Sequence, residues 1–321
     1  MVLVAEGQIF LFCQYFRELV TMRSNARSNP WPGVLVGVLL VASTAFLASR
    51  IAHASGDTAN NSPPPTSTSS QPAGSPNPRS SSPASAISTA GWKLSWQDDF
   101  NTTAALNRWS FDVGNVGGPA LAQLQWYDRG NATITGGKLA ITATANGGGH
   151  QCWNGPCHYS SVRMQSHFGQ AYGLFEARIK LPAGSGLWPA FWLQGDNYDQ
   201  VGLPKAGELD IAEEPNRPPL NELHGFSHAP QGIHKFTADL PQPLSAGYHV
   251  YAIEWTRSRI TWLVDGKAYG HLDSYPGWPF NHPFNIILNL AVGGNWPGSP
   301  TSSTHFPASM DVDWVRVYRK A

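Results

Sequence analysis

The chain has 321 residues and a formal net charge of zero, and only 13% of its residues are charged. Because it has no basic stripe to neutralise a run of phosphates, we do not expect a nucleic-acid partner. Its 13 tryptophans instead suit a neutral ligand such as a sugar, whose C–H face an indole ring can cover. All of them except Trp31 lie after residue 90, so we expect the folded core in the C-terminal part of the chain.

Residues 1–54 have the order of an export signal. The apolar run Gly33–Ser49 follows two arginines and precedes Ala52-His53-Ala54, an A-x-A site. This order predicts a signal peptide cleaved after Ala54 or, as a second interpretation, an uncleaved signal anchor that attaches the protein to a membrane. Met22 is a candidate for the true start. Both interpretations predict a secreted or extracellular protein.

Residues 55–90 are rich in Ser, Pro and Thr and contain no aromatic residue. Such a segment buries too little apolar surface to offset its ordering entropy, so we predict a disordered linker. The remaining residues, 91–321, are predicted to form one domain.

In that domain, short segments of alternating polarity recur between Gly, Pro and Asn residues, which predicts strands without long helices. The clearest are Lys138–Ala143, Gly173–Lys180, His249–Trp255, Ile260–Val264, Phe284–Leu290 and Met310–Tyr318. Asp265-Gly266 is typical of the tight turn of a hairpin. We therefore expect an all-β fold of two antiparallel sheets packed face to face.

Two cysteines, Cys152 and Cys157, fall in this domain, whereas Cys13 falls in the leader. In an oxidising compartment this pair is expected to form a disulfide. A zinc site is the weaker interpretation, because only His150 and His158 stand nearby and no second cysteine pair exists.

The segment Gly207–Glu214 reads GELDIAEE and carries the most chemical information. Side chains of a strand alternate between its faces, so Glu208 and Asp210 share one face while Glu213 would point to the other in a regular strand. An extra residue at Ile211-Ala212, forming a β-bulge, would return Glu213 to the acidic face.

Acids that converge in this way suit glycoside hydrolysis. Retaining glycosidases place two carboxyl groups about 5 to 5.5 Å apart, one as the nucleophile and one as the acid. Repulsion among neighbouring carboxylates should raise the pKa of at least one of them. The alternative interpretation of Glu208, Asp210 and Glu213 is a solvated acidic strand edge.

The surroundings of these acids resemble glycoside hydrolase family 16 of the laminarinase type. The similar motifs are FEARIKLP at 175–182, GLWPAFW at 186–192, ILNLAVGGNWPG at 287–298 and DWVRVY at 313–318. They follow the order of the family, and the likeness covers about Trp92 to Arg319. The bulged E-x-D-x-x-E form accompanies β-1,3-glucanases and some galactan hydrolases in this family.

The resemblance implies a β-jelly-roll sandwich of the concanavalin A type, with a substrate cleft across its concave sheet. By position, Glu208 is the nucleophile, Glu213 the acid/base and Asp210 the residue that holds and tunes the nucleophile. The implied activity is endo-hydrolysis of β-1,3-glucan with retention. Mixed-linkage glucan or a galactan as the substrate, transglycosylation, and non-catalytic glucan binding are the alternatives.

The resemblance also suggests which side chains contact the substrate. Trp188 and Trp192 resemble sugar-stacking residues, although core packing would also place both on one strand face. His224 and His228 alternate on one face, in a segment similar to the family's HGxxHGP. Weaker candidates are Trp296 and Arg178, which could equally pair with Glu176 or Glu254.

Family members often hold a structural calcium ion on the convex face, and Asp99, Gly137 and Asp313 match those ligands loosely. No catalytic cofactor is implied, and a monomer is expected. The sequence departs from the family in three places. After His228 the usual Gly-Pro-Gly stretch is replaced by APQG at 229–232. The usual N-E-L-Q-Y-Y is AQLQWY at 122–127, and the insert around Cys152–Cys157 is not typical.

Overall fold

The computed structural model describes residues 87–321. The predicted leader, residues 1–54, and nearly all of the predicted linker, 55–90, lie outside the described residues. Within the described part of the chain, no helix is long and apolar enough to cross a membrane.

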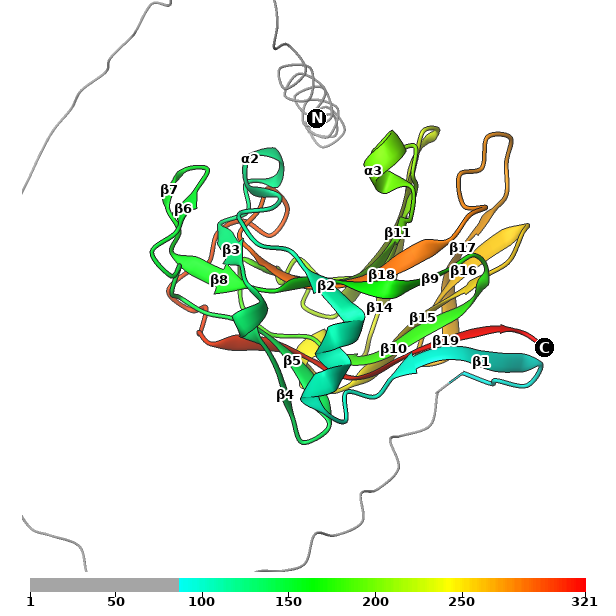
Figure 1. The fold of residues 1–321 in the computed structure, drawn as a ribbon, viewed down its shortest axis with the longest axis horizontal. Coiled ribbons are helices and arrows are strands. Elements are labelled where there is room, and N and C mark those ends of the chain that lie inside the picture. The colour runs from blue at the N-terminus through cyan, green and yellow to red at the C-terminus, as the bar shows by residue number, and fades with distance from the viewer. Residues whose placement is uncertain (1–86) are drawn as a thin grey trace, which may run out of the picture. The chain divides into compact units, whose positions relative to one another are not determined.

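The domain has two layers, each a large antiparallel sheet (Figure 1). The eight-stranded sheet has the order β17 (Lys267–Asp273), β16 (Arg259–Val264), β15 (His249–Trp255), β10 (Gly173–Lys180), β19 (Ala308–Lys320), β5 (Lys138–Ala143) and β4 (Ala132–Thr135), and β1 (Trp92–Asp98) also pairs with β19. The seven-stranded sheet has the order β14 (Gly232–Asp239), β13 (Glu222–Ala229), β12 (Glu208–Glu213), β11 (Leu187–Gly195), β18 (Phe284–Val292), β9 (Arg163–Gln170) and β2 (Trp109–Phe111). The predicted all-β jelly-roll sandwich is confirmed.

Short elements join these strands. They are the helices η1 (Thr103–Arg108), α2 (Gly118–Leu121), η2 (Arg129–Asn131), α3 (Tyr198–Val201) and η3 (Leu244–Ala246), and the strands β3 (Gln125–Tyr127), β6 (Gln151–Cys152), β7 (Gly155–Pro156) and β8 (Tyr159–Ser161). Among them, β3 and β8 pair in parallel, and β6 and β7 form a two-stranded hairpin.

The core lies between the two sheets. Alternate residues of the seven-stranded sheet, such as Phe191, Leu193 and Leu209, pack there against Phe175 and Ile253 of the other sheet, and all five are fully buried. Each sheet thus buries one set of alternating side chains and leaves the other set on its outer face. We call the outer face of the seven-stranded sheet the acidic face, because it carries Glu208, Asp210 and Glu213.

The strand predictions are confirmed with small differences at the ends. Strands β5, β10 and β15 have the predicted bounds, whereas β16, β18 and β19 are one or more residues longer. Asp265 and Gly266 both have positive φ angles, 47° and 78°, as a type I′ hairpin turn requires.

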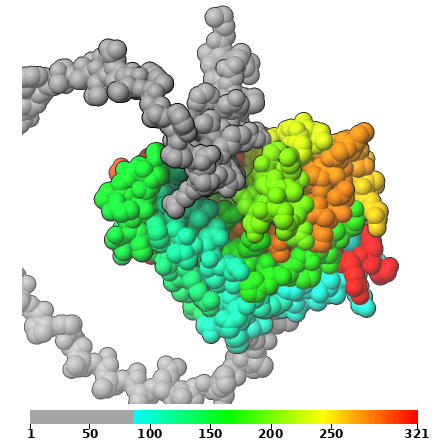
Figure 2. Space-filling model, turned by 45° about the horizontal axis from the view of Figure 1, so that its top comes forward, coloured from blue at the N-terminus to red at the C-terminus, as the bar shows by residue number. Residues whose placement is uncertain are grey.

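Figure 1 shows α2, β6 and β7 at one end, and α3 at the other, on the same side of the seven-stranded sheet. In Figure 2, the green segment near residue 150 and the lime segment near residue 200 stand apart on this face. The acidic face therefore has structured segments at both ends.

Candidate active site

The acidic face depends on an irregularity in β12. On one side Trp192 pairs with Asp210 and Phe191 with Ala212, so Ile211 has no partner on β11. On the other side, Asp210 pairs with Phe226 and Glu213 with His224. One extra residue therefore sits between the acids, and both Ile211 and Ala212 point into the core. The predicted β-bulge is confirmed.

The carbonyl groups at the bulge are satisfied from the opposite sheet. The Trp262 indole Nε1 donates to the Asp210 carbonyl at 2.8 Å, and the Tyr269 hydroxyl donates to the Ile211 carbonyl at 3.2 Å. Gly225, opposite the bulge, makes room for both. A Cβ at that position would lie 2.6 Å from the Trp262 ring and 2.7 Å from the Tyr269 hydroxyl oxygen. Because a buried carbonyl without a donor is costly, these two side chains stabilise the bulged register.

We expect Trp262→Phe to lower the free energy of unfolding by about 1–3 kcal/mol, because it leaves the Asp210 carbonyl without its donor. We also expect a lower kcat, since the carboxyl group of Asp210 moves with its backbone. Trp255→Phe is the matched control, because the Trp255 Nε1 donates to the Phe280 carbonyl, away from the bulge. Chemical denaturation and steady-state kinetics measure both effects. An equal kcat loss in the two variants would contradict this role of Trp262.

Glu208 and Asp210 both lie next to the side chain of His228. The His228 Nε2 lies 3.0 Å from an Asp210 carboxyl oxygen and 3.6 Å from a Glu208 carboxyl oxygen. Ligand atoms of these three residues all lie within 4.8 Å of one another. Glu213 is close enough that Asp210, His228 and Glu208 all shift its pKa. The three acids and His228 thus form one electrostatic unit.

Burial and repulsion act together on Glu213. Burial raises the pKa of its carboxyl group well above the ordinary value, and the Asp210 and Glu208 carboxylates raise it further. The charge on His228 and the hydrogen bond from Trp188 lower the Glu213 pKa without cancelling that rise. Burial lowers the pKa of His228, but the Glu208 and Asp210 carboxylates outweigh it and raise that pKa to about 9. At neutral pH His228 is therefore an imidazolium, and the protonated form of Glu213 is favoured over that of an ordinary glutamate.

Aromatic side chains border these acids. The Trp188 Nε1 donates to a Glu213 carboxyl oxygen at 2.8 Å, and its ring meets the half-buried Trp296 edge-on at 5.4 Å between centroids. Trp192 is buried with Ala190 and Ile287, outside the main core, and its Nε1 donates to Asn289 at 2.7 Å. All three predicted tryptophans therefore lie on the acidic face, and Trp188 touches the site directly.

His224 differs from His228 in its electrostatics. Burial, aided by Lys235 and Arg217, lowers the pKa of His224 to about 4. Its ring meets Trp296 edge-on at 4.9 Å, and its Nε2 lies 3.3 Å from a Glu222 carboxyl oxygen. It is therefore neutral at neutral pH and supports the aromatic side of the site.

The similarity of the chain to known proteins agrees with its fold and with the geometry of the acids. Residues 122–316 match the family described as Glycosyl hydrolases family 16. The chain belongs to family 16. As a member, it is a glycoside hydrolase that needs no catalytic cofactor, and retention of anomeric configuration is general for the family.

Three relatives illustrate the family's range. The glucan endo-1,3-beta-glucosidase of Cryptopygus antarcticus is 36% identical over 256 residues, which cover 72% of this chain and 93% of that protein. The laminarinase catalytic domain of Thermotoga maritima has a TM-score of 0.67 at 35% identity, covering 72% of this chain and 99% of that one. The clotting factor G alpha subunit of Tachypleus tridentatus is 36% identical over 240 residues, 72% of this chain and 34% of that protein. The chain thus spans about a third of this last relative.

Two predicted groups lie away from the family 16 acids. Arg178 is on β10 of the eight-stranded sheet, where it pairs with Asp313 at 2.8 Å and not with Glu176 or Glu254. The prediction that it contacts substrate beside the acids is therefore wrong, because it belongs to the opposite sheet. Asp99 pairs with Arg316 at 3.1 Å. Both candidate calcium carboxylates thus form ion pairs with arginines, with which a calcium ion would have to compete for their oxygen atoms.

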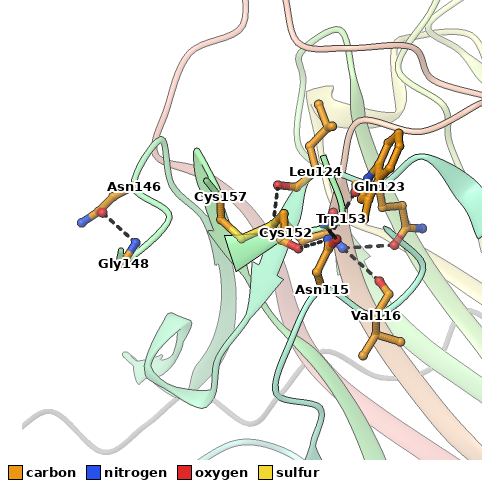
Figure 3. Close-up of a disulfide and its surroundings, with 10 residues drawn as sticks. Asn115, Val116, Gln123, Leu124, Asn146, Gly148, Cys152, Trp153 and Cys157 are labelled. Atoms are coloured by element: carbon orange, nitrogen blue, oxygen red, sulfur yellow. Dashed lines mark hydrogen bonds between the residues drawn. A yellow bond between two sulfur atoms is a disulfide. The ribbon is translucent and has the colours of Figure 1, made fainter. Parts of the chain in front are cut away.

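The disulfide between Cys152 and Cys157 is confirmed, with a Cα–Cα distance of 5.0 Å. It closes the β6–β7 hairpin and faces the segment from Asn115 to Leu124 (Figure 3). Because both sulfur atoms are bonded to each other, the zinc interpretation is not supported.

Several residues that shape this family 16 site were not predicted from the sequence. They are Gly225, Trp262 and Tyr269 behind the bulge and Asn289 under Trp192. No local pattern in the sequence marks them, because they lie on strands other than β12.

Glu214 is buried beside the site, only 2% exposed, and burial raises its pKa to about 8. One of its carboxyl oxygens, like the hydroxyl of the nearby Tyr251, has no hydrogen-bond partner among the described residues. Because its folded pKa lies above the unfolded value of 4.5, its contribution to stability is complete below pH 4.5 and is lost as the pH rises through 8.

We therefore expect Glu214→Gln to raise the free energy of unfolding at pH 9 by about 2 kcal/mol, because glutamine cannot ionise in this buried position. At pH 4.5 the variant and the wild type should be nearly equal. Urea denaturation at both pH values measures this. The interpretation fails if the stability difference between the two proteins is the same at both pH values.

Proposed function

We propose that this protein is an endo-acting β-1,3-glucanase that hydrolyses its substrate with retention, through a covalent glycosyl-enzyme intermediate. The observation that carries the proposal is the bulge in β12, which gathers Glu208, Asp210 and Glu213 on one face. The names of the relatives from Cryptopygus antarcticus and Thermotoga maritima support β-1,3-glucan as the polymer.

In this proposal Glu208 is the nucleophile. Its carboxylate lies 3.6 Å from the His228 imidazolium, which favours the ionised form needed to attack the anomeric carbon. Asp210 lies between the two glutamates in the strand and holds His228 at 3.0 Å. It thereby positions the cation and helps to keep Glu213 protonated.

Glu213 is the acid/base in this proposal. Burial and the neighbouring carboxylates raise the pKa of its carboxyl group, which favours the protonated form that can protonate the leaving oxygen. The Trp188 indole fixes one of its oxygens by a 2.8 Å hydrogen bond. Once the glycosyl-enzyme has formed, the ionised Glu213 can deprotonate the incoming water.

A substrate panel tests the proposed activity. The full chain is incubated with laminarin, lichenan, agarose, carrageenan and xyloglucan, and the products are sized. We expect laminarin to yield a ladder of oligosaccharides from internal cuts, with the β-anomer formed first in a proton NMR time course. Faster cleavage of lichenan or agarose would assign the site to mixed-linkage glucan or a galactan, and products longer than the donor would indicate transglycosylation. No cleavage of any polymer would favour a glucan-binding protein.

We also propose that the protein is exported and acts as a monomer. The order of residues 1–54 and the disulfide in the domain, which suits an oxidising compartment, support export. Mass spectrometry of the mature N-terminus distinguishes cleavage after Ala54 from an uncleaved anchor, and light scattering measures the oligomeric state. Calcium at Asp99, Gly137 and Asp313 stays a prediction, and thermal melting with and without a chelator checks it.

A further inference from the structure

The β6–β7 hairpin exposes an aromatic ring that the catalytic unit does not use. Trp153, at the turn of this hairpin, is 49% exposed, and it is the only aromatic residue among the exposed large apolar side chains of residues 87–321. The hairpin coincides with the insert around Cys152–Cys157. An exposed indole offers a flat apolar face together with a polar N–H group, a combination that suits a sugar ligand.

The ring is held in place. The backbone N–H of Trp153 donates to the Asn115 side-chain oxygen at 3.1 Å, and its indole Nε1 donates to the Gln123 carbonyl at 3.0 Å. Asn115 itself donates to the carbonyls of Gln123 and Gln125 at 3.2 and 2.7 Å. With the disulfide closing the hairpin, as Figure 3 shows, little freedom is left to lose when a ligand covers the ring.

The segment that holds Trp153 is also hydrogen-bonded to the part of the chain that leads to Trp296. Leu124, next to Gln123, donates its N–H to the Val292 carbonyl at 2.8 Å, and the Asn295 N–H donates to the Leu121 carbonyl at 2.9 Å. The next residue after Asn295 is Trp296, which meets Trp188 beside Glu213. The hairpin therefore stands at the Glu213 end of the acidic face, and Figure 1 shows β6 and β7 on that side of the sheet.

We propose that Trp153 is a distal sugar-binding platform, which stacks on a glucose unit of a β-glucan chain that extends beyond Trp188 and Trp296, and that the Cys152–Cys157 disulfide holds it in position. The proposal rests on the function proposed above. A neutral polymer suits this place, because an indole face covers the apolar face of a sugar without requiring a charged partner.

This role makes Trp153 a determinant of substrate length. A short oligosaccharide that fills the sites around Glu208 and Glu213 does not reach the hairpin, whereas a long chain gains contact with it. The contact is equal in the ground state and the transition state, because it is remote from the reacting bond, so it should change KM and leave kcat unchanged.

The test compares full-length wild type with Trp153→Ala on β-1,3-gluco-oligosaccharides of increasing length. For the longest substrates we expect KM to rise roughly three- to tenfold in Trp153→Ala, as for loss of one aromatic anchor, with kcat unchanged. For the shortest cleaved substrates both constants should stay at the wild-type values. Trp153→Phe keeps a stacking face and should recover most of the lost affinity. Leu94→Ala, an exposed apolar residue on β1 of the other sheet, is the matched control.

A second variant tests the disulfide. Cys152→Ser combined with Cys157→Ser should raise KM for long substrates in the same direction while leaving short ones unaffected, and thermal melting shows whether the domain stays folded. If KM depends on substrate length in Trp153→Ala as it does in wild type, Trp153 is not a sugar-binding platform, even though the enzyme is a glucanase. If wild type cleaves no β-1,3-glucan at all, the proposed function fails instead.

Discussion

Replacing Glu208 by glutamine is expected to lower kcat on laminarin by roughly a thousandfold or more, because the amide cannot attack the anomeric carbon. The side chain keeps its size, and it lies at a partly exposed position on the acidic face, so the melting temperature should change little. Release of reducing sugar measures the first effect and differential scanning calorimetry the second.

Two companion variants sharpen this result. Glu213→Gln should also be inactive on laminarin, but it should retain glycosyl-enzyme formation from an aryl glycoside, whose leaving group needs no proton. Glu214→Gln makes the same chemical change one residue further along and outside the acidic face, so at pH 6 it should keep wild-type activity. A Glu208→Gln protein that still cleaves laminarin would exclude the mechanism proposed here.

The second large effect is expected at His228. Its imidazolium lies 3.6 Å from Glu208 and 3.0 Å from Asp210, and a charge-assisted hydrogen bond such as the one to Asp210 contributes about 1.5–3 kcal/mol. We expect His228→Asn to lower kcat by roughly 10- to 100-fold. KM should change less, because the polar contacts of His228 are to the acids and not to a surface further along the acidic face.

The pH profile separates this role from simple packing. His228 is a cation below its pKa of about 9, and its charge lowers the pKa of Glu213. Removing that charge should raise the pKa of Glu213, the acid that must be protonated, and move the alkaline limb of the kcat/KM profile to higher pH. In wild type, activity should fall as the pH rises past about 9, where His228 loses its proton. His271→Asn, which changes an exposed histidine on β17, is the control, and an unshifted alkaline limb in His228→Asn would contradict the assignment.

Much of the fold was predictable because local patterns carry it. Alternating polarity marked β5, β10 and β15 to the residue, and the Asp265-Gly266 pair marked the turn between β16 and β17. The bulge in β12 was predictable as well, since three acids spaced E-x-D-x-x-E share one face only if an extra residue is inserted.

What the sequence could not supply was the pairing of distant segments. Arg178 and Asp313 are 135 positions apart in the chain. Nothing in the FEARIKLP motif indicates that its strand belongs to the eight-stranded sheet, whereas the acids lie on the seven-stranded sheet. The donors behind the bulge come from β16 and β17 for the same reason. The raised pKa of Glu213 was predicted from repulsion, but burial is its largest cause, and burial depends on the whole sandwich.

The extra residue in β12 allows the strand to be shortened by one residue without moving an acid to the other face. Because Ile211 and Ala212 both point inward, loss of Ile211 would leave Glu-Leu-Asp-Ala-Glu, in which strict alternation still presents all three acids outward. Deletion of this one residue thus keeps the reactive groups on one face and alters mainly the local twist of the strand. Loss of one residue elsewhere in β12, between Glu208 and Asp210, would instead turn the nucleophile into the interior and abolish activity.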